Sequence, residues 1–259
     1  MRSTRLEVMM SDQSPTPGSE APLLPPAAPE TAAAVFGERM SMATTFATVL
    51  ADTGVSHGLI GPREVPILWE RHILNCAVAH EAFPEDAEIV DVGSGAGLPG
   101  LALAIARPDL HLHLVEPMLR RTTWLTDTIG VLGLTNATVH RGRAEEFDGV
   151  LSVEWATARA VARIDKLARW TFPLLAEGGT LVALKGRSAQ DELDATAPTL
   201  RKLGMTASEV VTYGAEILEV PTVTMQLTIR PRPVPAKAKA KRAAKARTKG
   251  TGSGGSARS

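Results

Sequence analysis

The sequence predicts an α/β protein of the Rossmann-like class, with a seven-stranded, mostly parallel sheet and an N-terminal helical cap. Strand-like and helix-like segments alternate from about residue 88 onward, which is typical of a parallel sheet covered by helices on both faces. A glycine-rich turn follows the first strand. The last two strands have no helix between them, so they are predicted to pair antiparallel.

Hydrophobic periodicity places each element. The predicted strands span residues 88–92, 111–115, 137–140, 154–159, 180–184, 208–213 and 223–229. The predicted helices between them span about residues 99–107, 118–132, 163–175 and 189–203. Upstream, apolar residues at helical spacing predict helices over about 30–52 and 65–79, separated by a loop at 54–62. These two helices form the predicted cap.

The chain is predicted to have four parts. Residues 1–28, rich in Ser, Pro and Ala, form a disordered tail, residues 29–80 form the cap and residues 81–230 form the main domain. Residues 231–259 form a second disordered tail with nine of the 28 basic residues and no acidic residue. The rest of the chain therefore carries 19 basic and 28 acidic residues, a net charge of −9. A cationic tail on an acidic body predicts attraction to a polyanion.

The composition disfavours a membrane or secreted protein. No apolar run reaches the roughly 18 residues of a membrane span, and no apolar signal region follows the first arginines. The single cysteine, Cys76, excludes an internal disulfide and suits a reducing compartment. We therefore expect a cytoplasmic protein.

The glycine-rich turn predicts a nucleotide-like ligand. Gly93, Gly95 and Gly97 separate a buried strand from a helix that begins near Leu98, and glycine lets a ligand lie directly on the backbone. The second strand ends on Glu116, whose carboxylate can accept hydrogen bonds from two ribose hydroxyls. The G-x-G-x-G spacing favours S-adenosylmethionine, whereas dinucleotide enzymes typically have G-x-G-x-x-G. NAD remains the rival, because it shares the ribose-binding acid.

A second group of candidates follows the third strand. Ala144 and Glu145 are predicted to meet adenine, the first through its backbone amide and the second through its carboxylate. The alternative is that these residues cap a helix and point their carboxylates into water.

These segments together resemble the bacterial 16S ribosomal RNA (guanine-N7)-methyltransferases, a family once called glucose-inhibited division protein B. The resemblance covers roughly residues 35–230 and is carried by the segments Arg71–Asn75, Asp91–Gly100, Gly142–Phe147, Ala158–Ala160 and Ala183–Gly186. It implies the class I S-adenosylmethionine-dependent methyltransferase fold and methyl transfer to N7 of one guanine in 16S ribosomal RNA. The family's cofactor positions fall here on Gly93, Leu98, Ala144, Glu145 and Arg159. The sequence departs from the family at Asn75, often Asp, and at Ala158, often Ser.

The implied chemistry needs few reactive side chains. Guanine N7 has an in-plane lone pair and no proton, so we predict no general base, no covalent nucleophile and no metal site. Cys76 is expected to be core filler on the cap helix, away from the strand tips. Arg159 and Lys185, at the tips of the fourth and fifth strands, are predicted to position the cofactor or the target nucleotide. For Arg159 the alternative is a salt bridge to Glu145.

Basic residues near the strand tips are candidates for RNA contact. They are Arg71, His72, Arg120, Arg121, Arg143 and Lys185. For each arginine or lysine the alternative is an ordinary solvated charge. For His72 the alternative is a packing histidine of its helix. The basic C-terminal tail is predicted to bind RNA through counterion release.

Alternative functions remain open from the sequence. A small-molecule methyltransferase would share the fold, and so would a binding protein without activity. An NAD-dependent oxidoreductase is disfavoured by the glycine spacing and by the lack of a Tyr-x-x-x-Lys pair, since Tyr213 is the only tyrosine. For the leading interpretation we expect a monomer that acts on the small ribosomal subunit rather than on naked RNA.

Overall fold

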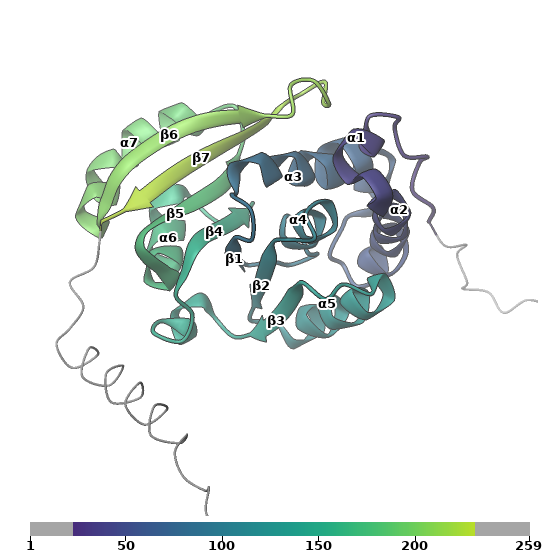
Figure 1. Ribbon diagram of the computed structural model, residues 1–259, viewed down its shortest axis with the longest axis horizontal. Helices are drawn as coiled ribbons and strands as arrows, with labels where there is room; N and C mark the ends of the chain where they lie inside the picture. The colour runs from purple at the N-terminus through teal and green to yellow at the C-terminus, as the bar shows by residue number, and fades with distance from the viewer. Residues whose placement is uncertain (1–22, 231–259) are drawn as a thin grey trace, which may run out of the picture.

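The computed structural model describes residues 23–230, so the predicted basic tail and most of the predicted N-terminal tail lie outside the described residues. Seven strands form one sheet in the order β3-β2-β1-β4-β5-β7-β6 (Figure 1). Their bounds are β1 Glu88–Val92, β2 His111–Glu116, β3 Ala137–Arg141, β4 Val153–Arg159, β5 Leu175–Lys185, β6 Met205–Tyr213 and β7 Thr222–Ile229. The predicted seven-stranded, mostly parallel sheet is confirmed.

The centre of the sheet is parallel and covered on both faces. β1 pairs parallel with both β2 and β4, and all of its residues after Glu88 are buried. A strand buried on both faces is expected to be almost continuously apolar, and Ile89-Val90-Asp91-Val92 departs from that only at Asp91. The strand order reverses at β1 and β4, which is where such sheets bind ligands beyond the carboxyl ends of their strands.

The far edge of the sheet contains the predicted antiparallel hairpin. β7 pairs antiparallel with both β5 and β6. The one reversed strand is therefore β7, the second strand from the edge, and β6 is the edge strand. Lys185 at the end of β5 is opposite Val223 near the start of β7. The loop between β6 and β7 therefore emerges at the same edge of the sheet as the tips of β4 and β5. β5 begins at Leu175, five residues before the predicted start at 180.

Helices cover both faces of the sheet (Figure 1). They are α4 Gly100–Ala106, α5 Leu119–Leu132, α6 Ile164–Thr171 and α7 Ala189–Leu203, with short 3-10 turns η6 Ala144–Phe147 and η7 Phe172–Leu174. The predicted helix over 163–175 ends early because Pro173, in η7, has no backbone N–H to donate. None of the helices within residues 23–230 is long and apolar enough to cross a membrane.

The cap is helical, but it is more interrupted than predicted. The first segment consists of α1 Ala32–Phe36, η1 Gly37–Arg39, α2 Met40–Val49 and the π-helical turn η2 Leu50–Gly54. The second consists of η3 Pro62–Ile67, the π-helical turn η4 Trp69–Leu74, α3 Asn75–Ala77 and η5 Val78–Ala82. The first break is at Gly37, whose φ of 49° is outside the helical region.

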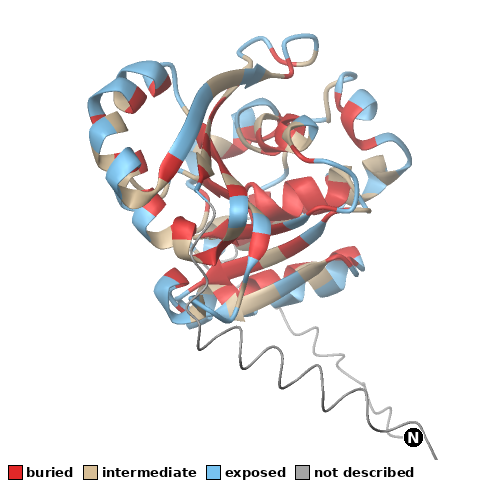
Figure 2. Ribbon diagram, turned by 60° about the vertical axis from the view of Figure 1, so that its left-hand side comes forward, coloured by how far each residue is buried: buried red, intermediate tan, exposed pale blue. Residues whose placement is uncertain are grey.

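The cap shares one hydrophobic core with the sheet. Phe46, Leu50 and Leu68 of the cap are fully buried in the same cluster as Leu101 and Leu103 of α4. Figure 2 colours the buried parts of the sheet and of the helices around it red. A second cluster lies on the other side of the sheet, beneath α6 and α7. The cap is therefore packed onto the α4 side of the sheet, close to the tips of β1 and β2.

Candidate functional site

A cleft of about 570 Å³ opens beyond the carboxyl ends of β1 to β4. It brings together most of the predicted cofactor residues and three of the predicted RNA residues. Its lining includes Gly93, Gly95, Leu98, Glu116, Ala144, Glu145 and Arg159, together with His72, Arg121 and Arg143. Gly97 does not line the cleft.

The floor of the cleft is the glycine turn between β1 and α4. Gly93, Gly95 and Gly97 have φ values of 76°, 53° and 74°, a region that other residues rarely adopt. A Cβ on Gly97 would lie 2.4 Å from Leu101 Cδ1, so Gly97 is required for packing of the turn onto α4. Gly100 is equally confined, because a Cβ there would lie 2.4 Å from Leu114 Cδ2 and 2.6 Å from Asp91 Oδ2. Its backbone N–H donates to Asp91 Oδ2 at 3.1 Å.

Asp91 is fully buried beneath this turn. Burial is the main reason that its pKa is raised to about 7, although the N–H of Gly100 partly opposes the shift. Its second oxygen, Oδ1, has no hydrogen-bond partner among the described residues. Asp91 thus ties the end of β1 to the start of α4.

Glu116 lies at the end of β2 with its side chain only 2% exposed. Oε2 accepts the N–H of Gly95 at 3.1 Å, and Oε1 accepts the N–H of Met118 at 3.0 Å. Each carboxylate oxygen has a further lone pair, so the two ribose bonds predicted for Glu116 remain chemically possible. Arg121 Nη1 is 3.6 Å from Oε2, and the buried Nε of Arg121 has no hydrogen-bond partner within residues 23–230.

Two neighbouring carboxylates after β3, Glu145 and Glu146, have different surroundings. Glu146 accepts the N–H of Arg143 at 2.9 Å and returns its own N–H to the Arg143 carbonyl, so it caps η6. Glu145 does not take part in this cap, and it lines the cleft beside the buried Ala144. The capping alternative therefore applies to Glu146. Glu145 is exposed and lines the cleft, and its contact with adenine stays a prediction.

Arg159, at the tip of β4, is held by the cap. Its Nη2 bonds to His72 Nδ1 and to the Arg71 carbonyl, both at 2.9 Å, and its Nη1 donates to Cys76 Sγ at 3.2 Å. His72 Nε2 in turn lies 2.7 Å from Glu64 Oε2. The alternative of a salt bridge between Arg159 and Glu145 is not observed.

Cys76 requires a correction. It is fully buried, as a core residue should be, but its contact with Arg159 places it beside the β4 tip and not away from it. Burial raises the pKa of its thiol, and the guanidinium of Arg159 only partly opposes this. The thiol is therefore a poor nucleophile.

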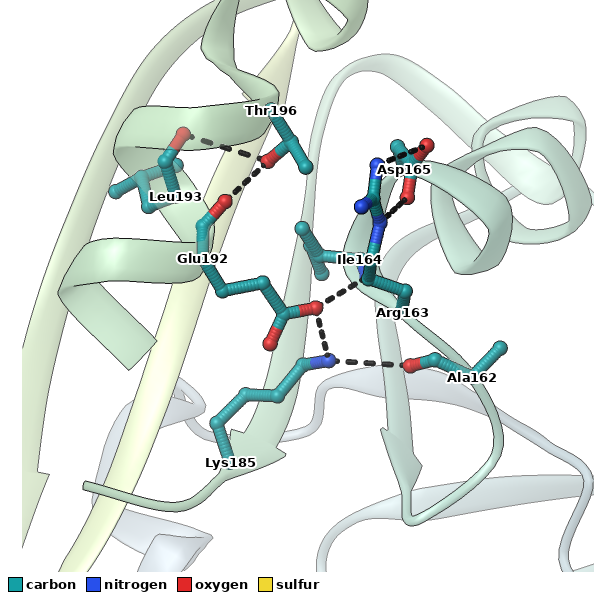
Figure 3. Close-up of polar contacts among 8 residues, drawn as sticks. All are labelled: Ala162, Arg163, Ile164, Asp165, Lys185, Glu192, Leu193 and Thr196. Carbon is teal, nitrogen blue, oxygen red and sulfur yellow. Dashed lines mark hydrogen bonds and ion pairs between the residues drawn. The ribbon is translucent and has the colours of Figure 1, made fainter. Parts of the chain in front are cut away.

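Lys185 is already paired at the tip of β5. Its Nζ lies 2.9 Å from Glu192 Oε1 and donates to the Ala162 carbonyl at 3.1 Å (Figure 3). Glu192 Oε1 also accepts the N–H of Ile164 at 2.6 Å, at the start of α6. In this structure Lys185 therefore anchors the loop after β4. These contacts account for the position of its ammonium group without a bound RNA phosphate.

Besides Lys185, two further predicted RNA residues lie outside the cleft. Arg71 is 66% exposed and borders a second cavity, while Arg120 is exposed at the start of α5 and borders neither cavity.

Comparison with known proteins identifies the family. The family model for the rRNA small subunit methyltransferase G, also called GidB, matches residues 39–220. The chain is 50% identical to the ribosomal RNA small subunit methyltransferase G of Streptomyces avermitilis over 82% of this chain and 89% of that protein. It is also 50% identical to the protein of that name from an Arthrobacter species, over 76% of this chain and 92% of that protein. The chain belongs to this family.

One solved structure with a similar chain trace is TYW2 of M. jannaschii in complex with AdoMet. It has a TM-score of 0.48 and 16% identity, and the match covers 64% of this chain and 80% of that one.

The cleft of this family member fits the family's methyl donor, S-adenosylmethionine. A Cβ on Gly95 would meet no atom closer than 3.7 Å, so the backbone there is open to a ligand. The carboxylate of Glu116, which accepts the N–H of Gly95, and the side chain of Arg121 supply hydrogen-bonding groups beside it. No group of three or more His, Cys, Asp or Glu that could hold a metal ion is found among residues 23–230.

Several cleft residues were not predicted from the sequence. Leu59 and Ile60 come from the cap, Met118 follows β2, Val161 follows β4 and Trp170 comes from α6. Their positions depend on how the cap and α6 fold over the strand tips. Only Met118 carried a usable sequence signal, because it lies two residues after Glu116.

Proposed function

We propose that this methyltransferase transfers a methyl group from S-adenosylmethionine to N7 of a guanine in 16S ribosomal RNA of the small subunit. One observation carries the proposal: the family's cofactor positions Gly93, Leu98, Ala144, Glu145 and Arg159 all line one cleft at the strand tips. The small-molecule methyltransferase of the same fold is the weaker candidate, because the family match extends across the cap as well as the sheet.

Each wall of the cleft is assigned a part of the cofactor. Gly93 and Gly95 present backbone to the amino-acid portion, and the Glu116 carboxylate accepts the ribose hydroxyls. Ala144 and Glu145 bind adenine through an amide and a carboxylate. Arg159, which is held rigidly by His72, donates to the carboxylate of the methionine portion or to the target nucleotide.

The chemistry requires alignment more than proton transfer. The cofactor supplies a methyl group on a positively charged sulfur, which leaves as a neutral thioether. The N7 lone pair forms the new N–C bond as the C–S bond breaks, and the positive charge passes to the purine. The residues of the site therefore have to orient the two reactants in line and exclude water. No acid–base pair is needed, so the raised pKa of Asp91 and the lowered pKa of His72 have structural causes.

RNA is proposed to approach over the basic groups around the strand tips. Arg71, Arg120 and Arg143 are exposed there, and the residues after 230 add nine basic groups. An acidic body disfavours binding of naked RNA, so the substrate is the assembled subunit, with ribosomal proteins making part of the contact. The protein acts as a cytoplasmic monomer, in which residues 29–80 cap the catalytic domain of residues 81–230.

The test is a transfer assay with a labelled methyl donor. Small subunits from a strain that lacks this modification should accept label, and protein-free 16S RNA should accept much less. Label on neither substrate, or equal uptake with a small-molecule acceptor, would contradict the proposal. A nicotinamide nucleotide should neither bind nor compete with the donor.

A further inference from the structure

A second cavity, of about 790 Å³, adjoins the cofactor cleft. The two share three consecutive residues, Arg159, Ala160 and Val161, which follow β4. Most of the other residues that line the second cavity come from the tips of β5 and β7 and from the loop before β7, and the cap adds Arg71 and Asn75. An acceptor that attacks the methyl group in line must lie next to the cofactor, and this cavity meets that condition.

The shared wall is strained and firmly anchored. Ala160 has a φ of 55°, a left-handed conformation that is uncommon for residues other than glycine. Strained residues persist where the surrounding structure holds them, and they cluster at functional sites. Here Lys185 and Glu192 hold the following residues, Ala162 and Ile164, in place (Figure 3).

The charges in the second cavity fit one nucleotide. Arg71 and Arg187 are exposed cations on its lining and suit the phosphates on either side of a base. Glu219, in the loop before β7, is the one carboxylate among the residues that line it. No ion pair or hydrogen bond of the Glu219 side chain occurs within the described part of the chain, so its carboxylate is available to a ligand.

A carboxylate in this place selects guanine. On its Watson–Crick edge guanine presents two adjacent donors, N1–H and the 2-amino group, and the two oxygens of a carboxylate accept both. Adenine, cytosine and uracil do not present this pair of donors. Bases of single-stranded RNA are commonly read on this edge after they have been unstacked.

The same pairing directs N7 toward the cofactor. N7 lies on the opposite side of the purine from N1 and the 2-amino group. Along the edge of the sheet, Glu219 is on the β7 side and Arg159–Val161 is at the tip of β4, beside the cofactor cleft, with only β5 between them. A guanine held by Glu219 therefore turns its N7 toward the shared wall.

We propose that the second cavity binds the flipped target guanine and that Glu219 reads its Watson–Crick edge. This inference rests on the proposed function, because it places the acceptor of that reaction. Asn75 also lines this cavity. It is the position at which the family often has Asp.

The test uses Glu219→Gln with Glu216→Gln as the matched control, since Glu216 is exposed in the same loop and does not line the cavity. Small subunits are assembled with 16S RNA that carries either guanosine or inosine at the target site. Inosine keeps N7 but lacks the 2-amino group. For each protein, kcat/KM is measured on both kinds of subunit, and the value with guanosine is divided by the value with inosine.

We expect a ratio of about ten or more for the natural protein and for Glu216→Gln, because a carboxylate would lose one charged hydrogen bond to inosine. For Glu219→Gln the ratio should fall toward one, with unchanged affinity for S-adenosylhomocysteine. A natural ratio of one, or a Glu219→Gln ratio equal to the natural ratio, would overturn the inference. If the natural protein does not methylate subunits with guanosine, the proposed function itself fails.

Discussion

Arg159 Nη2 lies 2.9 Å from His72 Nδ1, a contact between the tip of the fourth strand and the cap across 87 residues of sequence. Arginine can only donate, so His72 Nδ1 must be the acceptor and the ring proton lies on Nε2, toward Glu64. Burial and the charge of Arg159 lower the pKa of His72, which favours this neutral form. The cap thereby fixes the orientation of a guanidinium at the wall shared by the two cavities.

Arg159→Ala is expected to lower kcat/KM for methylation of small subunits at least about a hundredfold, because loss of alignment has effects of this size. The melting temperature should fall by about 6–12 °C, since three hydrogen bonds of about 1 kcal/mol each are lost and each kcal/mol is worth about 2–4 °C. Arg159→Lys should recover little activity. A lysine ammonium cannot donate to His72, Cys76 and a ligand at once with the planar geometry of the guanidinium. Full activity of Arg159→Ala would remove it from the site.

Glu116→Gln should weaken binding of S-adenosylhomocysteine about 10- to 100-fold in titration calorimetry. The glutamine has a single acceptor oxygen, so it cannot serve the N–H groups of Gly95 and Met118 and also the ribose. Glu154→Gln is the control, because Glu154 is exposed near the other end of β4. Equal affinity in the Glu116 and Glu154 variants would place the ribose elsewhere.

Asp91→Asn tests the buried acid in the absence of cofactor. Because the folded-state pKa of about 7 is above the ordinary 3.8, the folded protein holds a proton that the unfolded chain has released. The natural protein therefore loses stability as pH rises from about 4 to 7. The free energy of unfolding of Asp91→Asn, relative to the natural protein, should rise by about 3 kcal/mol between pH 5 and pH 8. The free energies of unfolding are measured by denaturant titration. If their difference between the two proteins does not change with pH, Asp91 is ionised in the folded protein.

Removal of residues 231–259 should weaken binding of the small subunit mainly at low salt. Each phosphate that the tail contacts adds about 0.7 to the slope of log affinity against log salt, so this slope should become shallower. A tail with its nine basic residues changed to glutamine should behave like the deletion. If the natural and shortened proteins bind alike at every salt concentration, the tail has no part in RNA contact.

Local patterns were sufficient to predict the sheet and to bring the glycine turn and Glu116 to the same edge. The strand ending in Val92, the glycine turn and the strand ending in Glu116 are consecutive in sequence, and a parallel sheet brings such strand ends to one edge. Helix α7, Ala189–Leu203, was also predicted at its observed bounds, because its apolar periodicity is uninterrupted up to Gly204.

Contacts between distant segments were not predictable in the same way. The pairing of Arg159 with His72 and Cys76 depends on how the cap lies over β4, and no local pattern encodes it. The same holds for Lys185. Its partner Glu192 is close in sequence, but its second partner, Ala162, lies in the loop after β4. The interruptions of the cap, such as the break at Gly37, were not indicated by hydrophobic periodicity.

The most direct test of the account is the chemical identity of the methylated nucleoside. Small subunits that lack the modification are incubated with the protein and a labelled methyl donor, and the 16S RNA is digested and resolved by mass spectrometry. The account predicts one N7-methylguanosine per subunit and no other labelled nucleoside. Label on a base other than guanine, on another atom of guanine, or in no nucleoside at all would contradict it.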